Sequence, residues 1–313
     1  MNIPFQTSSL TPDIVSIPPQ AQVCFYNAAR RLELSTRDIQ CFADTGVMHL
    51  PGLSLHMQLW GETPAPQWYV IAALSRPDDV SPSLWNELLL RSNCSISAMS
   101  TCAVGIDERG DAVLINRLAA HPYSDFPYVA DELALVIALA ESLIGGATAL
   151  STGNRTDYPQ HFSSAARRPA EHESVQVTLA LNWHQSLIDQ ALRHLGSTQS
   201  LDSIETICVL RLGDQQLEVV ADSDKRHLVV STAIANVLRS DGQRALALGA
   251  NLELMTLTGC TIAMAPHGAC LQGRWDSRGL DGLALGNWLG DFSLLARTVG
   301  VDIPSFPAMR TRP

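Results

Sequence analysis

The sequence has little positive charge and carries no motif of a common catalytic or nucleotide-binding site. Its 21 lysine and arginine residues are outnumbered by 31 aspartate and glutamate residues, which gives a net charge of −10. Such a surface would repel the phosphates of a nucleic acid. No G-x-S-x-G, P-loop, G-x-G-x-x-G, H-E-x-x-H or EF-hand pattern occurs. The absences argue against a nucleic-acid partner and against the enzyme classes that these motifs mark.

The cysteines show no C-x-x-C spacing, and their number, seven, is odd. Most of them lie inside apolar stretches, where a thiol behaves as a small hydrophobic side chain. This pattern predicts free, buried thiols in a reducing cytoplasm rather than a disulfide framework. The seven residues are Cys24, Cys41, Cys94, Cys102, Cys208, Cys260 and Cys270.

Signals for export and for membrane insertion are also missing. The N-terminus lacks the basic start and apolar core of a signal peptide, and its Pro and Ser residues predict a flexible arm. The most apolar stretch, residues 133–150, is interrupted by Glu141 and by Gly145-Gly146. We interpret it as a buried helix with a glycine stop rather than a membrane span, and we expect no membrane partner.

What the sequence does contain is an internal repeat. Residues 83–118 align without a gap on residues 241–276, so that Asn93 matches Asn251 and Cys102 matches Cys260, always 158 positions apart (251 − 93 = 158). Repeats of this kind indicate duplication. The other identical pairs are Leu88 with Leu246, Leu90 with Leu248, and Gly110 with Gly268.

Each copy reads as a helix, three strands, a helix, a hairpin and a final helix. In the first copy, apolar spacing predicts helices at 20–34, 83–91 and 125–143, and alternation predicts strands at 47–50, 53–60, 68–74, 101–106 and 112–115. Gly110 suits the hairpin turn, because it can adopt a positive φ. In the second copy, helices are expected at 181–195, 242–250 and 280–299. The strands before its hairpin are expected at 206–212, 215–221 and 227–233.

The predicted fold class is therefore α+β, with two tandem copies of an α-β-β-β-α-β-β-α unit. Each unit would be a twisted antiparallel sheet with helices packed on it. The Ser-, Pro- and Arg-rich stretch between the copies reads as a linker. We expect an N-terminal arm at 1–19, domains at 20–148 and 179–303, a linker at 149–178 and a tail at 304–313.

The middle of the first copy carries a recognisable succession of motifs. A helix with Trp85, Leu88, Leu89 and Asn93 is followed by a strand, an acidic turn at 107–110, the apolar run 113–115 and a long aliphatic helix at 131–143. This succession resembles the class I type III secretion chaperones of the Tir chaperone (CesT) family. The resemblance covers residues 20–145 well and 181–300 more faintly.

The resemblance implies a cytoplasmic bacterial protein, associated with virulence, that binds another protein and is not an enzyme. Its partner would be the N-terminal chaperone-binding segment of a secreted effector, held in extended form, with the secretion ATPase as a further partner. Strand addition at a sheet edge and apolar grooves would supply the contacts. Candidate client-binding residues are Leu55, Met57, Val104, Ile106, Val113, Ile115, Val219, Ile262, Met264 and Leu271.

Family members usually form homodimers through the second helix. Two copies in one chain therefore predict an intrachain pseudo-dimer in which residues 82–92 meet 241–250. The predicted interface residues are Trp85, Leu88, Leu89, Leu246 and Leu248. Because the second helix carries Gly242 and Gly249 and no Trp, we expect this interface to be asymmetric.

Several alternatives remain open at this point. The client-binding candidates could be ordinary core residues. Cys102 or Cys260 could be the nucleophile of a cysteine-dependent hydrolase, with His121 or His267 as its base, although mid-strand thiols favour a structural role. The chain could also be a regulator or scaffold of the secretion apparatus without a client. We expect no cofactor and no metal, since His161, Glu171, His172 and Glu173 lack regular ligand spacing.

Overall fold

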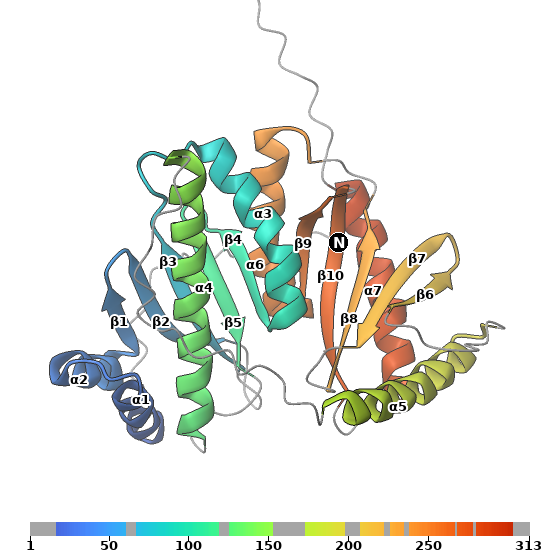
Figure 1. Cartoon of the computed structure of the whole chain (residues 1–313), viewed down its shortest axis with the longest axis horizontal. Coiled ribbons are helices and arrows are strands. Elements are labelled where there is room, and N and C mark those ends of the chain that lie inside the picture. Colours follow the sequence, from blue (N-terminus) through green and yellow to red (C-terminus); the bar gives the residue numbers. More distant parts are fainter. Residues whose placement is uncertain are drawn as a thin grey trace, which may run out of the picture. The chain divides into compact units, whose positions relative to one another are not determined.

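The computed structural model describes residues 17–60, 67–118, 125–152, 173–197, 207–221, 226–234, 238–266, 268–277 and 280–302 (Figure 1). Seven helices and ten strands occupy these ranges in an order that repeats along the chain. The predicted tail, most of the predicted arm and linker, and the histidines His121, His161, His172 and His267 lie outside the described residues.

The first sheet contains five antiparallel strands in the spatial order β1-β2-β3-β5-β4. Its register pairs Leu55 with Ala72 across β2 and β3, and Ile71 with Ile115 across β3 and β5. Gly110 turns the β4–β5 hairpin with φ +84°, as its position in the sequence predicts. The strands are β1 (Val47–Leu50), β2 (Leu53–Trp60), β3 (Gln67–Leu74), β4 (Cys102–Ile106) and β5 (Ala112–Arg117).

The second sheet repeats the same spatial order, β6-β7-β8-β10-β9. The last strand of each hairpin enters the sheet beside the third strand, so both sheets have the same topology. This agreement confirms the predicted tandem α+β fold. The strands are β6 (Ile207–Leu212), β7 (Gln215–Ala221), β8 (His227–Ala233), β9 (Cys260–Ala265) and β10 (Gly268–Asp276).

The N-terminal helices differ from the prediction in one respect. Helix α1 (Pro19–Arg31) was expected, and residues 35–38 were expected to end it. Instead, a second helix, α2 (Thr36–Thr45), begins within these residues. The hydroxyl oxygen Oγ of Ser35 accepts a hydrogen bond from the backbone N–H of Asp38 and caps the new helix. Phe25 of α1, Phe42 of α2 and Trp68 of β3 then join in one aromatic cluster.

Four helices run further than their sequence patterns suggest. They are α3 (Pro82–Met99), α4 (Phe126–Thr152), α6 (Asp241–Thr258) and α7 (Gly282–Asp302), and α5 (Glu173–His194) also begins early. The predicted glycine stop at Gly145-Gly146 is wrong, because α4 continues through both residues. By length and composition α4 could cross a membrane, yet it packs on α1, β3 and β5 through a buried stripe that includes Val129, Leu133 and Val136.

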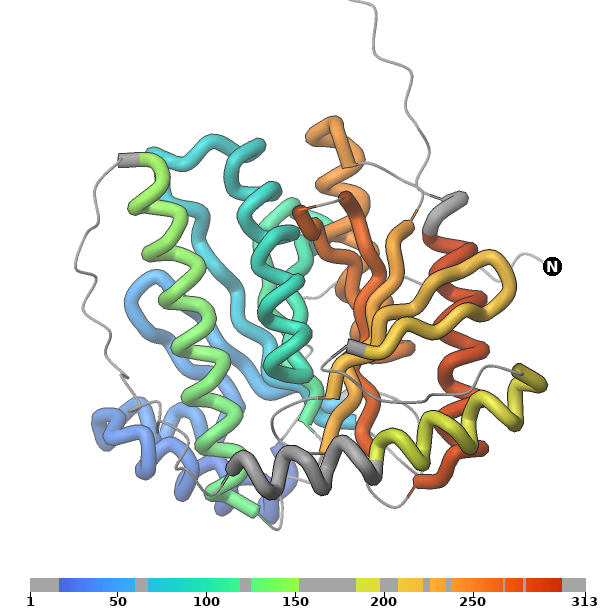
Figure 2. Tube along the Cα trace, turned by 45° about the vertical axis from the view of Figure 1, so that its right-hand side comes forward, coloured from blue at the N-terminus to red at the C-terminus, as the bar shows by residue number. Residues whose placement is uncertain are grey.

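Contacts divide the chain into two compact units, 1–81 with 104–162, and 82–103 with 163–313. Helix α3 therefore packs with the second unit, against β9, β10 and α6. Within that unit α5 also lies across α7, as both views show (Figures 1 and 2). The predicted domain boundaries and the pseudo-dimer stay predictions.

Candidate functional site

The predicted client-binding residues are core residues in this structure. Eight of the ten are buried, and only Ile106 and Met264 are half-buried. Alternation along a strand shows only which side chains share a face. Leu55 pairs with Ala72 and Ile115 with Ile71, so the candidates of the first sheet come from both of its faces. A client could reach these side chains only by displacing the elements that cover them. The eight buried residues are Leu55, Met57, Val104, Val113, Ile115, Val219, Ile262 and Leu271.

Helices α3 and α6 of the second unit meet at their N-terminal ends through a polar network. Ser83 Oγ donates a hydrogen bond to Asp241 Oδ1 at 2.7 Å. The guanidinium of Arg244 lies 3.3 Å from Ser83 Oγ, 3.1 Å from Asp241 Oδ1 and 3.7 Å from Glu87 Oε2. One cation thus links the first turns of the two helices.

Among the predicted interface residues, Trp85, Leu89 and Leu248 are buried, Leu88 is half-buried and Leu246 is exposed. The structure places α3 against α6 as expected. Leu246 is 46% exposed, whereas its repeat partner Leu88 is half-buried. Whether these residues hold a pseudo-dimer together stays a prediction.

The repeated asparagines meet at one strand. Asn251 donates from Nδ2 to the carbonyl oxygen of Ile262 at 2.9 Å, and its Oδ1 accepts from the N–H of Ile262 at 2.6 Å. Asn93 Nδ2 reaches the same carbonyl at 3.5 Å. Since β9 is the last strand of its sheet, these amides occupy backbone groups that would otherwise lack a partner strand. Sequence alignment found the pair but gave no sign of this role.

The opposite ends of the two sheets are the strands β1 and β6, each paired on one side within its sheet. β6 alternates between the buried Cys208 and Leu210 and the exposed Val209 and Arg211. Val209 and Arg211 already take part in further interactions. A sheet edge such as β1 is the type of surface to which an extended peptide can add.

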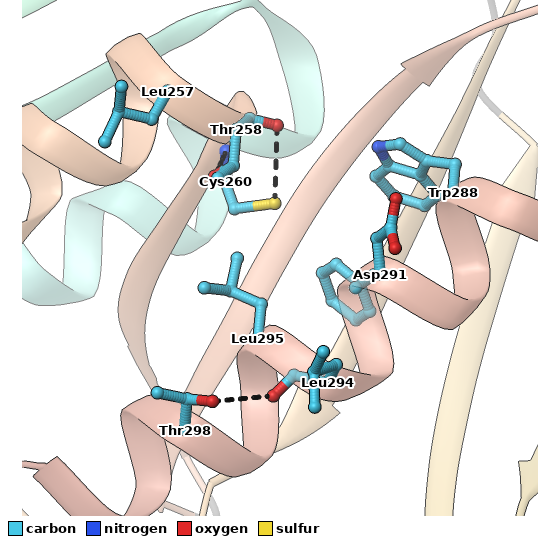
Figure 3. Close-up of a pocket in the computed structure, with 9 residues that line it drawn as sticks. Leu257, Thr258, Cys260, Trp288, Asp291, Leu294, Leu295 and Thr298 are labelled. Atoms are coloured by element: carbon cyan, nitrogen blue, oxygen red, sulfur yellow. Dashed lines mark hydrogen bonds between the residues drawn. The ribbon is translucent and has the colours of Figure 1, made fainter. Parts of the chain in front are cut away.

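An apolar pocket of about 470 Å³ lies in the second unit, between the end of α6, the start of β9 and α7 (Figure 3). Leu257 and Leu294 stand at its sides with 74% and 65% of their surface exposed. The indole of Trp288 stacks on Phe292 with 5.3 Å between the ring centroids. The remaining lining residues are Thr258, Cys260, Asp291, Leu295 and Thr298.

The backbone of β10 shapes this pocket. A Cβ atom on Gly273 would stand 3.0 Å from both Cys260 Sγ and Trp288 Cζ2, so only glycine lets the indole lie this close to the sheet. The pocket was not foreseen from the sequence, because its walls come from the ends of elements that no single motif connects.

The thiols give no support to a hydrolase at Cys260. Burial raises the pKa of Cys260 from its usual value of 9.0 to about 11, although a hydrogen bond with the side chain of Thr258 acts in the opposite direction. Cys260 is therefore a protonated thiol near neutral pH, whereas a cysteine nucleophile needs a lowered pKa. Cys102 is buried as well.

This burial predicts a loss of stability at alkaline pH. In the unfolded chain Cys260 ionises near pH 9, but in the folded chain it keeps its proton up to about pH 11. The unfolded state is therefore favoured increasingly between these two pH values, by about 1.4 kcal/mol per pH unit. We expect the free energy of unfolding, measured with urea, to fall less between pH 8 and pH 10 in Cys260→Ala than in wild type. Cys41→Ala, at an exposed thiol, should behave as wild type, and equal losses in all three proteins would contradict the prediction.

Within the described ranges, no three His, Cys, Asp or Glu side chains are grouped so that they could hold a metal ion. Glu173 is the first residue of α5, while its predicted companions Glu171 and His172 lie outside the described part of the chain.

Comparisons with known proteins agree with the sequence motifs. Residues 31–143 match the model of the Tir chaperone protein (CesT) family, whereas comparison with curated proteins finds no match. Three solved structures share low identity with the chain. The ExoT-SpcS complex from Pseudomonas aeruginosa contains a chain that is 16% identical, with 36% of this chain and 93% of that chain covered and a TM-score of 0.28.

The ExsC-ExsE complex gives 10% identity, 41% and 98% coverage, and a TM-score of 0.36. The HopA1-SchA chaperone-effector complex gives 13% identity, 39% and 94% coverage, and a TM-score of 0.33. Identities this low transfer no ligand to this chain. Over residues 31–143 the chain matches the model of the Tir chaperone protein (CesT) family, in agreement with the motifs of the first copy.

Proposed function

We propose that this protein is a cytoplasmic type III secretion chaperone. It binds the N-terminal segment of a secreted effector in extended form and keeps that segment competent for secretion. The observation that carries the proposal is the CesT family match over residues 31–143. Because the second sheet repeats the topology of the first, we infer that the second copy offers a second client-binding surface.

Strand addition at the edge strand β1 would supply the backbone contacts. An added strand satisfies N–H and C=O groups along the edge without regard to the client's side chains, and pockets beside the edge then select alternate side chains. Such binding suits an unfolded client, which pays its ordering cost on binding and can be released again for export.

The pocket between α6 and α7 would receive apolar side chains of the client. Leu257 and Leu294 already expose apolar surface there, and covering each of them would contribute roughly 1–2 kcal/mol. The net charge of −10 favours a client segment with basic residues and disfavours self-association.

The pocket can be tested with one variant and a matched control on the same helix. The client is first identified as a secreted protein that co-purifies with the tagged full chain. Leu294→Asp is then expected to weaken binding of the client's N-terminal segment at least tenfold, measured by calorimetry, because it places a charge where an apolar side chain should dock. Leu283→Asp changes an exposed leucine of α7 outside the pocket and should leave the affinity within twofold of wild type. Equal affinities for wild type and both variants would show that the client does not bind in the pocket.

A further inference from the structure

One acidic side chain lines the apolar pocket of the second unit. Asp291 lies on α7 three residues after Trp288, so the two side chains share one face of the helix. Figure 3 shows the carboxylate of Asp291 beside the indole, while Leu294 lies further along the helix. The pocket therefore combines apolar walls with a negatively charged end.

No positive charge of the pocket balances this carboxylate. None of the nine residues that line the pocket is basic. Cys260, whose pKa burial raises to about 11, is uncharged at neutral pH. Arg297, the basic residue of α7, pairs instead with Asp214 at 3.3 Å. In the part of the chain that the structure describes, Asp291 forms no ion pair, so its charge is available to a binding partner.

A cation on an apolar stem has the chemistry that such a site requires. The guanidinium of arginine can pair with a carboxylate and lie against an aromatic ring, while its methylene groups pack along apolar side chains. The net charge of −10 also attracts a basic segment to the surface of the chain. Charge complementarity therefore favours an arginine of the partner at the end of the pocket where Trp288 and Asp291 lie.

The spacing of the two parts of the pocket suits an extended segment. Asp291 and Leu294 are three residues apart on one helix, so their Cβ atoms lie roughly 5–6 Å from each other. In an extended peptide, residues i and i+2 point to the same side and lie roughly 6.6 Å apart. An arginine and an apolar residue with one residue between them can therefore reach Asp291 and Leu294 together.

We propose that the pocket selects an arginine that is separated by one residue from an apolar side chain in the client. Leu257 and Leu294 contact the apolar side chain, and Trp288 and Asp291 hold the guanidinium. The inference rests on the proposed function and adds to it the sequence feature that the client must carry.

The test measures the affinity of short peptides for the full chain, so it needs no identified client. One peptide is acetyl-Arg-Ser-Leu-Ser-Arg-amide, which carries the spacing in both chain directions, and the other has glutamine in place of both arginines. Binding is followed through the NMR signal of the Trp288 indole N–H, which Trp288→Phe assigns. We expect the arginine peptide to bind about fivefold more tightly. About 0.5 M salt should reduce this difference, because it screens exposed charges.

Asp291→Asn should bring the two affinities within about twofold of each other. Glu253→Gln changes an exposed carboxylate of α6 outside the pocket and should keep the preference for arginine. Acetyl-Ser-Arg-Leu-Arg-Ser-amide has the same charge but points its arginines away from the side of its leucine, so it should bind at least about threefold more weakly than the first peptide.

Three results would each overturn the proposal: equal affinities of the arginine and glutamine peptides for wild type, an unchanged preference in Asp291→Asn, or an indole signal that neither peptide shifts. The proposed function fails separately. A preference for arginine in a chain that binds no secreted protein would contradict only the chaperone role, whereas a bound client without this preference would contradict only the present inference.

Discussion

Replacing Asn251 by leucine is expected to lower the free energy of unfolding by about 3 kcal/mol. Asn251 is fully buried, and its amide pairs with both the N–H and the C=O of Ile262. Leucine has nearly the same size but removes both hydrogen bonds, which leaves two buried backbone groups without this partner. Each such group costs about 1–3 kcal/mol. Urea unfolding followed by circular dichroism would measure the change.

Asn287→Leu provides the control for this substitution, because Asn287 is exposed on α7 and its hydrogen bond, between Oδ1 and His194 Nε2 at 3.0 Å, lies at the surface. We expect it to change the stability by no more than about 0.5 kcal/mol. Equal effects at both asparagines would show that the amide of Asn251 does not stabilise the edge of the second sheet.

Gly282→Ala is expected to destabilise the second unit by about 2–3 kcal/mol. A Cβ atom at this position would stand 2.1 Å from Gln190 Cβ and 3.1 Å from the backbone nitrogen of Ala191. Neither atom belongs to a flexible side-chain end, so α5 and α7 would have to move apart. Overpacking of this kind typically costs 1–3 kcal/mol. The melting temperature of the full chain would report the loss.

The matched control is Gly249→Ala on α6. A Cβ atom there meets nothing within 4 Å, and alanine is the better helix former. This variant should therefore be more stable than wild type by about 0.5–1 kcal/mol. Opposite signs for the two substitutions would confirm the close approach of α5 to α7, whereas two small stabilising effects would contradict it.

The strands and the duplication could be predicted because both depend on local pattern. Alternation located β2, β7 and β8 closely, and the pairs Asn93–Asn251 and Cys102–Cys260 revealed the repeat. The helices were less predictable. Gly145-Gly146 reads as a stop, but the contacts of α4 with α1 and the first sheet outweigh the roughly 1 kcal/mol that each glycine costs in a helix.

Helix α2 was missed because the same polar residues are typical of the end of one helix and of the start of another. Ser35 and Asp38 look like the end of α1, yet Ser35 caps the start of the next helix, and Glu33 makes the turn between them with φ +57°. A positive φ at a glutamate gives no signal in the sequence, because glycine or asparagine is the usual residue there.

Surfaces were harder to predict than elements. Alternation identifies which side chains share a face but not which face is covered, so Leu55 and Ile262 read equally well as groove or core. The pocket beside Trp288 depends on tertiary packing between segments that no local pattern relates.

Limited proteolysis of the purified complex between the full chain and its co-purifying secreted protein tests the central proposal most directly. If the chain is a secretion chaperone, the protected fragment of the partner should come from its N-terminal ~100 residues, and the same fragment should be degraded rapidly in the absence of the chain, since an extended client folds only on binding. A protected fragment from a folded domain elsewhere in the partner, or an N-terminal segment that resists protease without the chain, would contradict the account.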